Sequence, residues 1–147
     1  MASTTNFMWM VFGWPISIFV DAAEKTIHSV VHVKNTSISR SSSSLWDYFT
    51  NEGERKRVGM GSGVIVSQDG YIITNYHVIE NATTIEVTTN ENKTYEAELL
   101  GGDEVSDIAV LKIIGKESFP YIRFADSNQT KIGEWVLAVG NPFNLTS

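Results

Sequence analysis

Short runs of alternating apolar and polar residues dominate the chain from Val58 onward, and they predict β-strands. The clearest pattern is a hairpin, in which GSGVIVS forms one strand, QDG at residues 68–70 forms the turn and YIIT forms the return strand. The chain has no internal repeat and no helical pattern long enough for a parallel βαβ sheet, so an all-β barrel or sandwich is predicted. Further strands are expected at residues 85–89, 94–100, 107–113 and 134–139.

The residues before Val58 follow a different pattern. Asp21 can cap a helix and Glu24 lies three residues later, as in a capping box, so a short helix is expected to begin at Asp21. The alternating SVVHVK of residues 29–34 then predicts a strand. Residues 35–57 contain the low-complexity sequence SISRSSSS and the basic sequence ERKR, and they are predicted to form a long surface loop.

Two strongly apolar segments lie outside the predicted strands. Residues 7–20 carry no charge, but the run is shorter than the about 20 residues that span a membrane, and Gly13 and Pro15 interrupt it. No basic residue precedes it, and three interpretations are open: a degenerate signal or anchor, a packing segment, or a start upstream of the true coding region. The second segment interrupts the predicted loop, and its large side chains are expected to dock on another surface: Leu45, Trp46, Tyr48 and Phe49.

Composition narrows the possible functions. The 147 residues are 42% hydrophobic and 19% charged, which suits a globular domain and not a disordered chain. Lys and Arg number 11 against 17 Asp and Glu, so the net charge is −6 and nucleic acid is not an expected partner. The absence of cysteine excludes disulfides, thiolate metal sites and a cysteine nucleophile within these residues.

The histidines are the first candidates for chemistry. His28 and His32 are four residues apart, but the chain there is entering a strand and no third ligand has suitable spacing, so neither a metal nor a cofactor is expected. His77 ends the hairpin strand, and Asp107 begins an otherwise apolar strand, where a partly buried carboxylate needs a partner. A histidine N–H is a suitable partner, because the carboxylate then fixes the tautomer that leaves the other ring nitrogen as a base. From spacing alone, a simple polar cap at the strand end is the alternative for His77.

Four motifs occur in order along the chain: GSGVIV from Gly61, DGYIITNYHVI from Asp69, DIAVLKI from Asp107 and GEWVLAVGNPF from Gly133. Together they resemble the HtrA/Deg-type, trypsin-like serine endopeptidases, over about residue 21 to the end of the sequence. The resemblance implies a chymotrypsin-like double β-barrel with a Ser-His-Asp triad between the barrels. By the same resemblance, His77 is the general base and Asp107 is its orienting carboxylate.

The chain departs from the family pattern at two points. Tyr76 stands where the family commonly has a second Asn, a change expected to alter packing without removing the base. The family nucleophile lies in a GNSGG-type motif, and no serine of this sequence lies in one: Ser62 belongs to the first barrel strand and Ser147 follows GNPFNLT. The 147-residue chain alone is therefore expected to be inactive, because the nucleophile and the oxyanion hole are absent.

The resemblance predicts an organisation in three parts. Residues 1–20 form the apolar N-terminal segment, and residues 21–128 form the first antiparallel barrel of the all-β fold, with the long loop at 35–57. Residues 129–147 form the first strand of the second barrel. Side chains of that strand would lack the sheet on which they pack, which creates an aggregation hazard, at Trp135, Leu137 and Phe143.

The family also implies a biological setting. Its members act in the bacterial cell envelope or periplasm on unfolded polypeptides, assemble as homotrimers through N-terminal contacts, and commonly carry PDZ domains after the catalytic domain. A membrane is an expected partner only if residues 7–20 are an anchor. Two other functions are open: a non-catalytic barrel that binds extended peptides by strand addition, with His77 and Asp107 as relics, and an interaction protein that uses the aromatic loop, either for oligomer contacts or for local packing.

Overall fold

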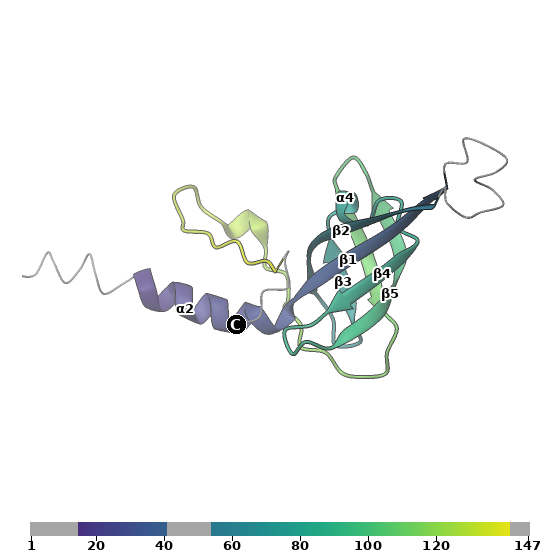
Figure 1. The fold of residues 1–147 in the computed structure, drawn as a ribbon. Coiled ribbons are helices and arrows are strands. Elements are labelled where there is room, and N and C mark those ends of the chain that lie inside the picture. The colour runs from purple at the N-terminus through teal and green to yellow at the C-terminus, as the bar shows by residue number, and fades with distance from the viewer. Residues whose placement is uncertain (1–14, 41–53, 142–147) are drawn as a thin grey trace, which may run out of the picture.

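The computed structural model describes residues 15–40 and 54–141 (Figure 1). In chain order its elements are α2 (Pro15–Thr26), η1 (Ile27–Ser29), β1 (Val30–Arg40), β2 (Glu54–Ile65), β3 (Tyr71–Thr74), α4 (Tyr76–Ile79), β4 (Thr84–Thr88), β5 (Thr94–Asp103), β6 (Ile108–Ile113) and η2 (Ser127–Gln129). The strands pair antiparallel and close into a barrel in the order β1-β2-β3-β6-β5-β4. The predicted all-β class and the predicted hairpin are therefore confirmed.

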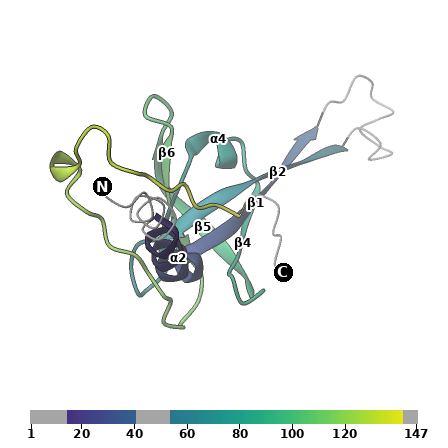
Figure 2. The ribbon, with the colours of Figure 1, turned by 90° about the vertical axis from the view of Figure 1, so that its left-hand side faces the viewer.

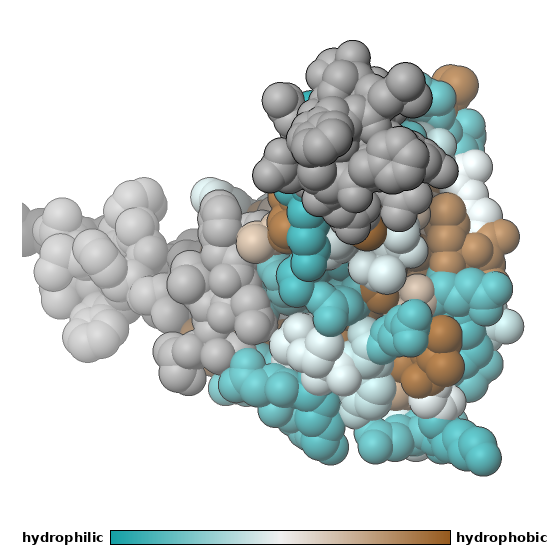
Figure 3. Space-filling model, turned by 45° about the vertical axis from the view of Figure 1, so that its right-hand side comes forward, coloured by the Kyte–Doolittle hydropathy of each residue, from teal (hydrophilic) through white to brown (hydrophobic). Residues whose placement is uncertain are grey.

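Alternation along the strands places one side of each strand in the barrel interior. Ile85 and Val87 on β4 and Leu111 and Ile113 on β6 are buried, whereas the residues between them are partly exposed. These side chains meet in one core cluster, which also receives Ile79 from α4. Burial of each stabilises the fold by about 1.5–3 kcal/mol, so the inward residues build the barrel. On the outside, hydrophobic and hydrophilic side chains are interspersed, as one face shows in Figure 3.

β1 and β2 are longer than the sequence pattern predicted. They pair along the whole of β1, so residues 35–40 and 54–57 are strand, and the prediction of a loop over all of residues 35–57 was wrong at both ends. Only His32–Thr36 of β1 also pairs with β4, and the two strands continue beyond the barrel as a ribbon (Figure 1). Pairing satisfies the backbone whatever the side chains are, so polar sequence there does not prevent strand formation. The rest of the predicted loop lies outside the described residues, with Leu45, Trp46, Tyr48 and Phe49.

The N-terminal helix also differs from the prediction. α2 begins at Pro15, so Asp21 lies in its interior and does not cap it. Proline is favourable in the first turn of a helix, because the N–H that it lacks would have no partner there. Within the ranges described, no helix is long and apolar enough to cross a membrane. Residues 7–14 of the apolar run lie outside those ranges.

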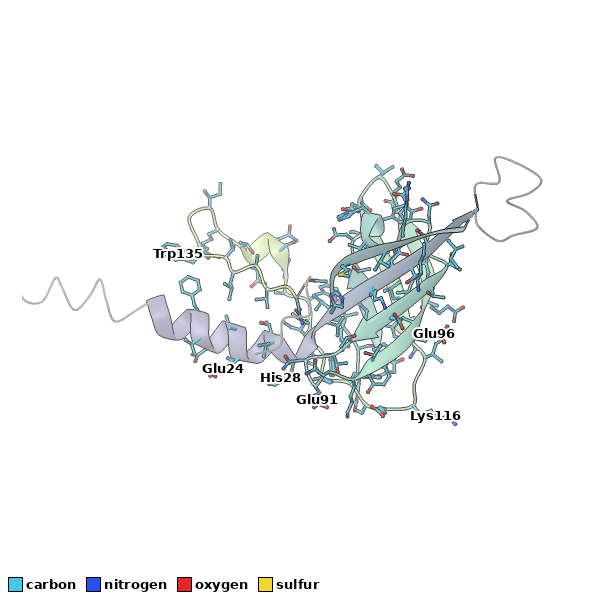
Figure 4. All side chains as sticks on the ribbon, in the orientation of Figure 1. Glu24, His28, Glu91, Glu96, Lys116 and Trp135 are labelled. Atoms are coloured by element: carbon cyan, nitrogen blue, oxygen red, sulfur yellow. The ribbon has the colours of Figure 1, made fainter. Side chains whose placement is uncertain are left out.

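Residues 134–139, predicted as a strand of the second barrel, form no strand. A strand needs hydrogen bonds to a neighbouring strand, and none of the described strands pairs with this segment. The segment lies on the same side of the barrel as α2 (Figures 2 and 4), and the ring of Trp135 contacts that of Phe19 edge to face at a centroid distance of 5.8 Å. Trp135 is nevertheless 82% exposed and Leu137 46% exposed, so neither is buried against the described strands. Phe143 lies outside the described residues.

Candidate active site

His77 and Asp107 meet at one end of the barrel, where α4 lies beside the connection between β5 and β6 (Figures 1 and 2). His77 is the second residue of the short helix α4, and Asp107 directly precedes β6. The Nδ1 atom of His77 lies 2.7 Å from Oδ2 of Asp107. The His77 backbone N–H also donates to Oδ1 of Asp107 at 2.9 Å, so both carboxylate oxygens hold the same residue.

A third residue completes the environment of the Asp107 carboxylate. The side-chain amide of Asn75 donates to Oδ2 at 3.1 Å and to the Asp107 backbone carbonyl at 3.2 Å. The same carbonyl accepts the backbone N–H of Tyr76 at 3.2 Å. The hydrogen bond from the His77 backbone, followed by that from its side chain, holds the pKa of Asp107 below its usual range. The carboxylate is therefore ionised near neutral pH and accepts every hydrogen bond offered to it.

The lowered pKa of Asp107 gives its contribution to stability a defined pH dependence. A carboxyl group with a lower pKa in the folded state stabilises the fold above its unfolded value of about 3.9, and this stability is lost as the pH falls through the folded pKa. We expect the urea midpoint of the wild type to fall more steeply below about pH 4 than that of Asp107→Asn. Asp69, Asp103 and Asp126 also have lowered pKa values, but they are unchanged in the variant. Parallel midpoint curves from pH 6 to pH 2.5 would contradict the expectation.

The connection that presents Asp107 is held by its own side chains. The carboxylate of Asp103 accepts the backbone N–H groups of Val105 and Ser106 at 3.1 and 3.3 Å, and the hydroxyl of Ser106 at 2.6 Å. Asp107 then adopts a positive φ of 54°, a conformation that Asp tolerates better than most residues. The sequence analysis did not identify Asp103, Ser106 or Asn75 as parts of the site. The Asp-x-x-Ser spacing, which is typical of a side-chain-stabilised turn, was the available signal for the first two.

The other candidate residues of the sequence have structural contacts. Ser62 lies on β2, and its hydroxyl accepts the backbone N–H of Asn141 at 2.7 Å. His32 is buried on β1, with Nδ1 3.0 Å from the carbonyl oxygen of Asn141. His28 is exposed, with Nδ1 3.4 Å from the side-chain nitrogen of Asn90. Neither histidine, His28 nor His32, belongs to a metal-binding group in the described part of the chain. Ser147 lies outside that part.

The surroundings of His77 allow its ring to accept a proton. Because an ionised carboxylate faces Nδ1, that nitrogen carries the proton and Nε2 is the basic one. His77 Nε2 makes no hydrogen bond to any residue in the described ranges, and the side chain is 68% exposed. The pair can therefore accept a proton from a hydroxyl group that approaches from outside this barrel.

Comparison with known proteins relates the chain to a peptidase family. A family model described as the trypsin-like peptidase domain matches residues 61–147. A DegP-like periplasmic serine endoprotease of Rickettsia prowazekii is 44% identical over 88 residues, which are 60% of this chain and 17% of the relative. Such proteins of Rhizobium meliloti and Chlamydia trachomatis are 42% identical over 94 residues and 47% identical over 85 residues, covering 64% and 58% of this chain and 19% and 17% of the relatives.

The match is specific but covers a small part of each relative. The aligned region spans less than a fifth of the length of these curated relatives. Their names place them in the periplasm, which supports the envelope location expected from the sequence. The closed antiparallel barrel agrees with the fold of the matched family. The chain belongs to the trypsin-like peptidase family, and within it the chain is similar to DegP-like serine endoproteases.

Proposed function

We propose that His77 is the general base of a serine endopeptidase and that Asp107 is the carboxylate that orients it. The observation that carries the proposal is the 2.7 Å contact between Nδ1 of His77 and Oδ2 of Asp107, with Nε2 directed to no described partner. In the reaction, Nε2 takes the proton of a serine hydroxyl as the oxygen attacks the peptide carbonyl, and returns it to the leaving amine. Asp107 keeps the required tautomer and stabilises the imidazolium that forms.

The substrates that we propose are unfolded polypeptides. The support is the likeness to DegP-like endoproteases, whose names state the reaction class, together with the acidic character of the chain, which disfavours nucleic acid.

We further propose that the protein works as a homotrimer, as the family resemblance implies. Light scattering coupled to size exclusion measures the molar mass in solution and so tests the trimer directly. A monomer at all protein concentrations would overturn this part of the proposal.

We propose that none of the described serines is the nucleophile. No serine of the sequence lies in a GNSGG-type motif, and no described serine hydrogen-bonds to His77. The hydroxyl of Ser62 accepts the backbone N–H of Asn141. We expect the 147-residue chain to hydrolyse no unfolded protein and to remain unlabelled by a serine-directed fluorophosphonate. Labelling that persists in His77→Ala would reveal a different site, and labelling lost in that variant would show that a serine of this chain is activated.

A chimera tests the base itself. Residues 21–141 are joined to the GNSGG-bearing segment of a DegP-like relative, so that the nucleophile is supplied from outside this chain. We expect the chimera to be labelled by the fluorophosphonate and its His77→Ala variant to lose labelling, because the serine is no longer activated. Equal labelling of both chimeras, with equal far-ultraviolet circular dichroism, would overturn the proposed role of His77. A non-catalytic peptide-binding barrel predicts that neither chimera is labelled.

A further inference from the structure

The helix that carries His77 packs against a glycine on β2. An ideal Cβ at Gly61 would lie 2.5 Å from Cγ2 and 2.7 Å from Cγ1 of Val78. Val78 is buried and belongs to the core cluster, so its side chain cannot swing into solvent to make room. The glycine two residues earlier differs, because a Cβ at Gly59 would make only ordinary contacts, the nearest at 3.6 Å.

A second glycine contacts the other neighbour of His77. An ideal Cβ at Gly102 on β5 would lie 2.7 Å from Cδ2 and 3.0 Å from Cε2 of the Tyr76 ring. Tyr76 packs against the core, and its backbone N–H donates to the Asp107 carbonyl at 3.2 Å. The adjacent Gly101 is again different, because a Cβ there would meet no atom within 4 Å.

We propose that Gly61 and Gly102 are positioning residues that place His77 for its contact with Asp107. Each accepts, in the space of an absent Cβ, the side chain of one residue that flanks His77 in the sequence. This inference rests on the proposed function, in which the pair is the base and its orienting carboxylate. It also gives the departure at Tyr76 a physical reason: the aromatic ring fits beside His77 because the facing residue on β5 has no side chain.

The geometry explains why adding one methyl group at Gly61 or Gly102 would affect His77. α4 is four residues long, and its position sets both the 2.9 Å bond from the His77 backbone and the 2.7 Å contact from its ring. A methyl group less than 3 Å from Val78 or Tyr76 forces a shift, and we expect the helix to move away from β2 or β5. Hydrogen bonds between nitrogen and oxygen weaken beyond about 3.2 Å, so a displacement of more than roughly half an ångström weakens the ring contact. The two glycines act from different strands and constrain the helix independently.

The test uses the 147-residue chain and needs no enzymatic activity. The readout is the Nδ1–H proton of His77 in ¹⁵N-edited NMR spectra, which a hydrogen bond to a carboxylate shifts downfield and protects from exchange with water. Gly61→Ala and Gly102→Ala are expected to lose this resonance. Gly59→Ala and Gly101→Ala are the matched controls on the same two strands, and both are expected to keep it. Thermal unfolding of each variant is followed in parallel.

Paired substitutions separate positioning from general damage. Val78→Ala removes both Cγ atoms, so Gly61→Ala/Val78→Ala is expected to regain the resonance, whereas Gly61→Ala/Val78→Thr keeps two branches and is not. Likewise Tyr76→Asn removes the ring and is expected to restore Gly102→Ala, whereas Tyr76→Phe keeps the ring and is not. Rescue in this pattern supports the proposal even if the single glycine variants unfold.

The outcomes distinguish the inference from the function on which it rests. If Asp107→Ala leaves the Nδ1–H resonance unchanged, the pair does not exist in solution, and the proposed function and this inference both fail. If Asp107→Ala abolishes the resonance while Gly61→Ala and Gly102→Ala retain it, only the inference is overturned. It is also overturned if the Val78→Ala and Tyr76→Asn double variants remain as defective as the single glycine variants.

Discussion

Replacing Asp107 with Asn in the chimera is expected to lower kcat by about 10⁴-fold, the order of loss seen when the triad carboxylate becomes an amide. The structure shows why an amide cannot substitute here. The His77 backbone N–H and the Asn75 amide both donate to the carboxylate, one to each oxygen. An Asn that turns its oxygen toward the His77 backbone presents its NH₂ group to Nδ1 of the ring. Nδ1 then becomes the acceptor, Nε2 carries the proton, and the ring cannot act as a base.

The measurement compares the steady-state kinetics of the chimera with those of its Asp107→Asn variant on an unfolded protein substrate. KM is expected to change little, because Asp107 acts through His77 and is not proposed to touch substrate. Asp126→Asn is the control: this carboxylate bonds Asn128 and Gln129 near η2 and has no contact with His77, so kcat should stay within about twofold. A loss in Asp107→Asn smaller than about tenfold would contradict the proposed orienting role.

Replacing Leu111 with Ala is expected to cost about 2–5 kcal/mol of unfolding free energy, which is a large fraction of the stability of a domain of this size. Leu111 is fully buried in the middle of β6, where it pairs with β3 on one side and β5 on the other. Truncation removes buried apolar surface and leaves a cavity, because the backbone on both sides is fixed by ladder hydrogen bonds and cannot collapse into it.

Leu100→Ala is the matched control for this prediction. The chemical change is the same, but Leu100 is 50% exposed, so the expected loss is within about 0.5 kcal/mol. Urea denaturation of the 147-residue chain, followed by tryptophan fluorescence and circular dichroism, gives both values. If the two leucine variants lost similar free energy, the barrel interior would not be organised around β6 as described.

Local sequence pattern predicted the strand positions well where one side of the strand is apolar. The alternation in TIEVT and IAVLKI predicted β4 and β6 to within a residue or two at their ends, because burial on one side selects both strand and register. The pattern failed where strands carry polar side chains on the β1–β2 ribbon, since backbone pairing leaves no trace in hydropathy. It also failed at residues 134–139, where an apolar alternating segment has no described strand with which to pair.

The sequence likewise predicted some residues of the candidate site and missed others. His77 and Asp107 were identified from residue type, from their position at strand ends and from the family resemblance. Asn75 was missed because its role depends on a hydrogen bond to Asp107, which is remote in the chain. Asp103 was missed although its bonds to Val105 and Ser106 are local and the Asp-x-x-Ser spacing indicates them. The tight approaches at Gly61 and Gly102 were also invisible in the sequence, since a glycine in a strand pattern does not reveal which side chain fills its space.

By itself, the sequence determined the all-β class, most strand positions and the family, and it singled out His77 and Asp107 as candidates, because local periodicity and short motifs indicate each of these. Only the tertiary structure decided that residues 30 positions apart meet at 2.7 Å, and which oxygen of Asp107 faces which nitrogen of His77. Those facts depend on closure of the barrel, which brings α4 against β2 and the end of β5. Distances of this kind are set by packing between segments that are remote in the chain, and local sequence carries no measure of them.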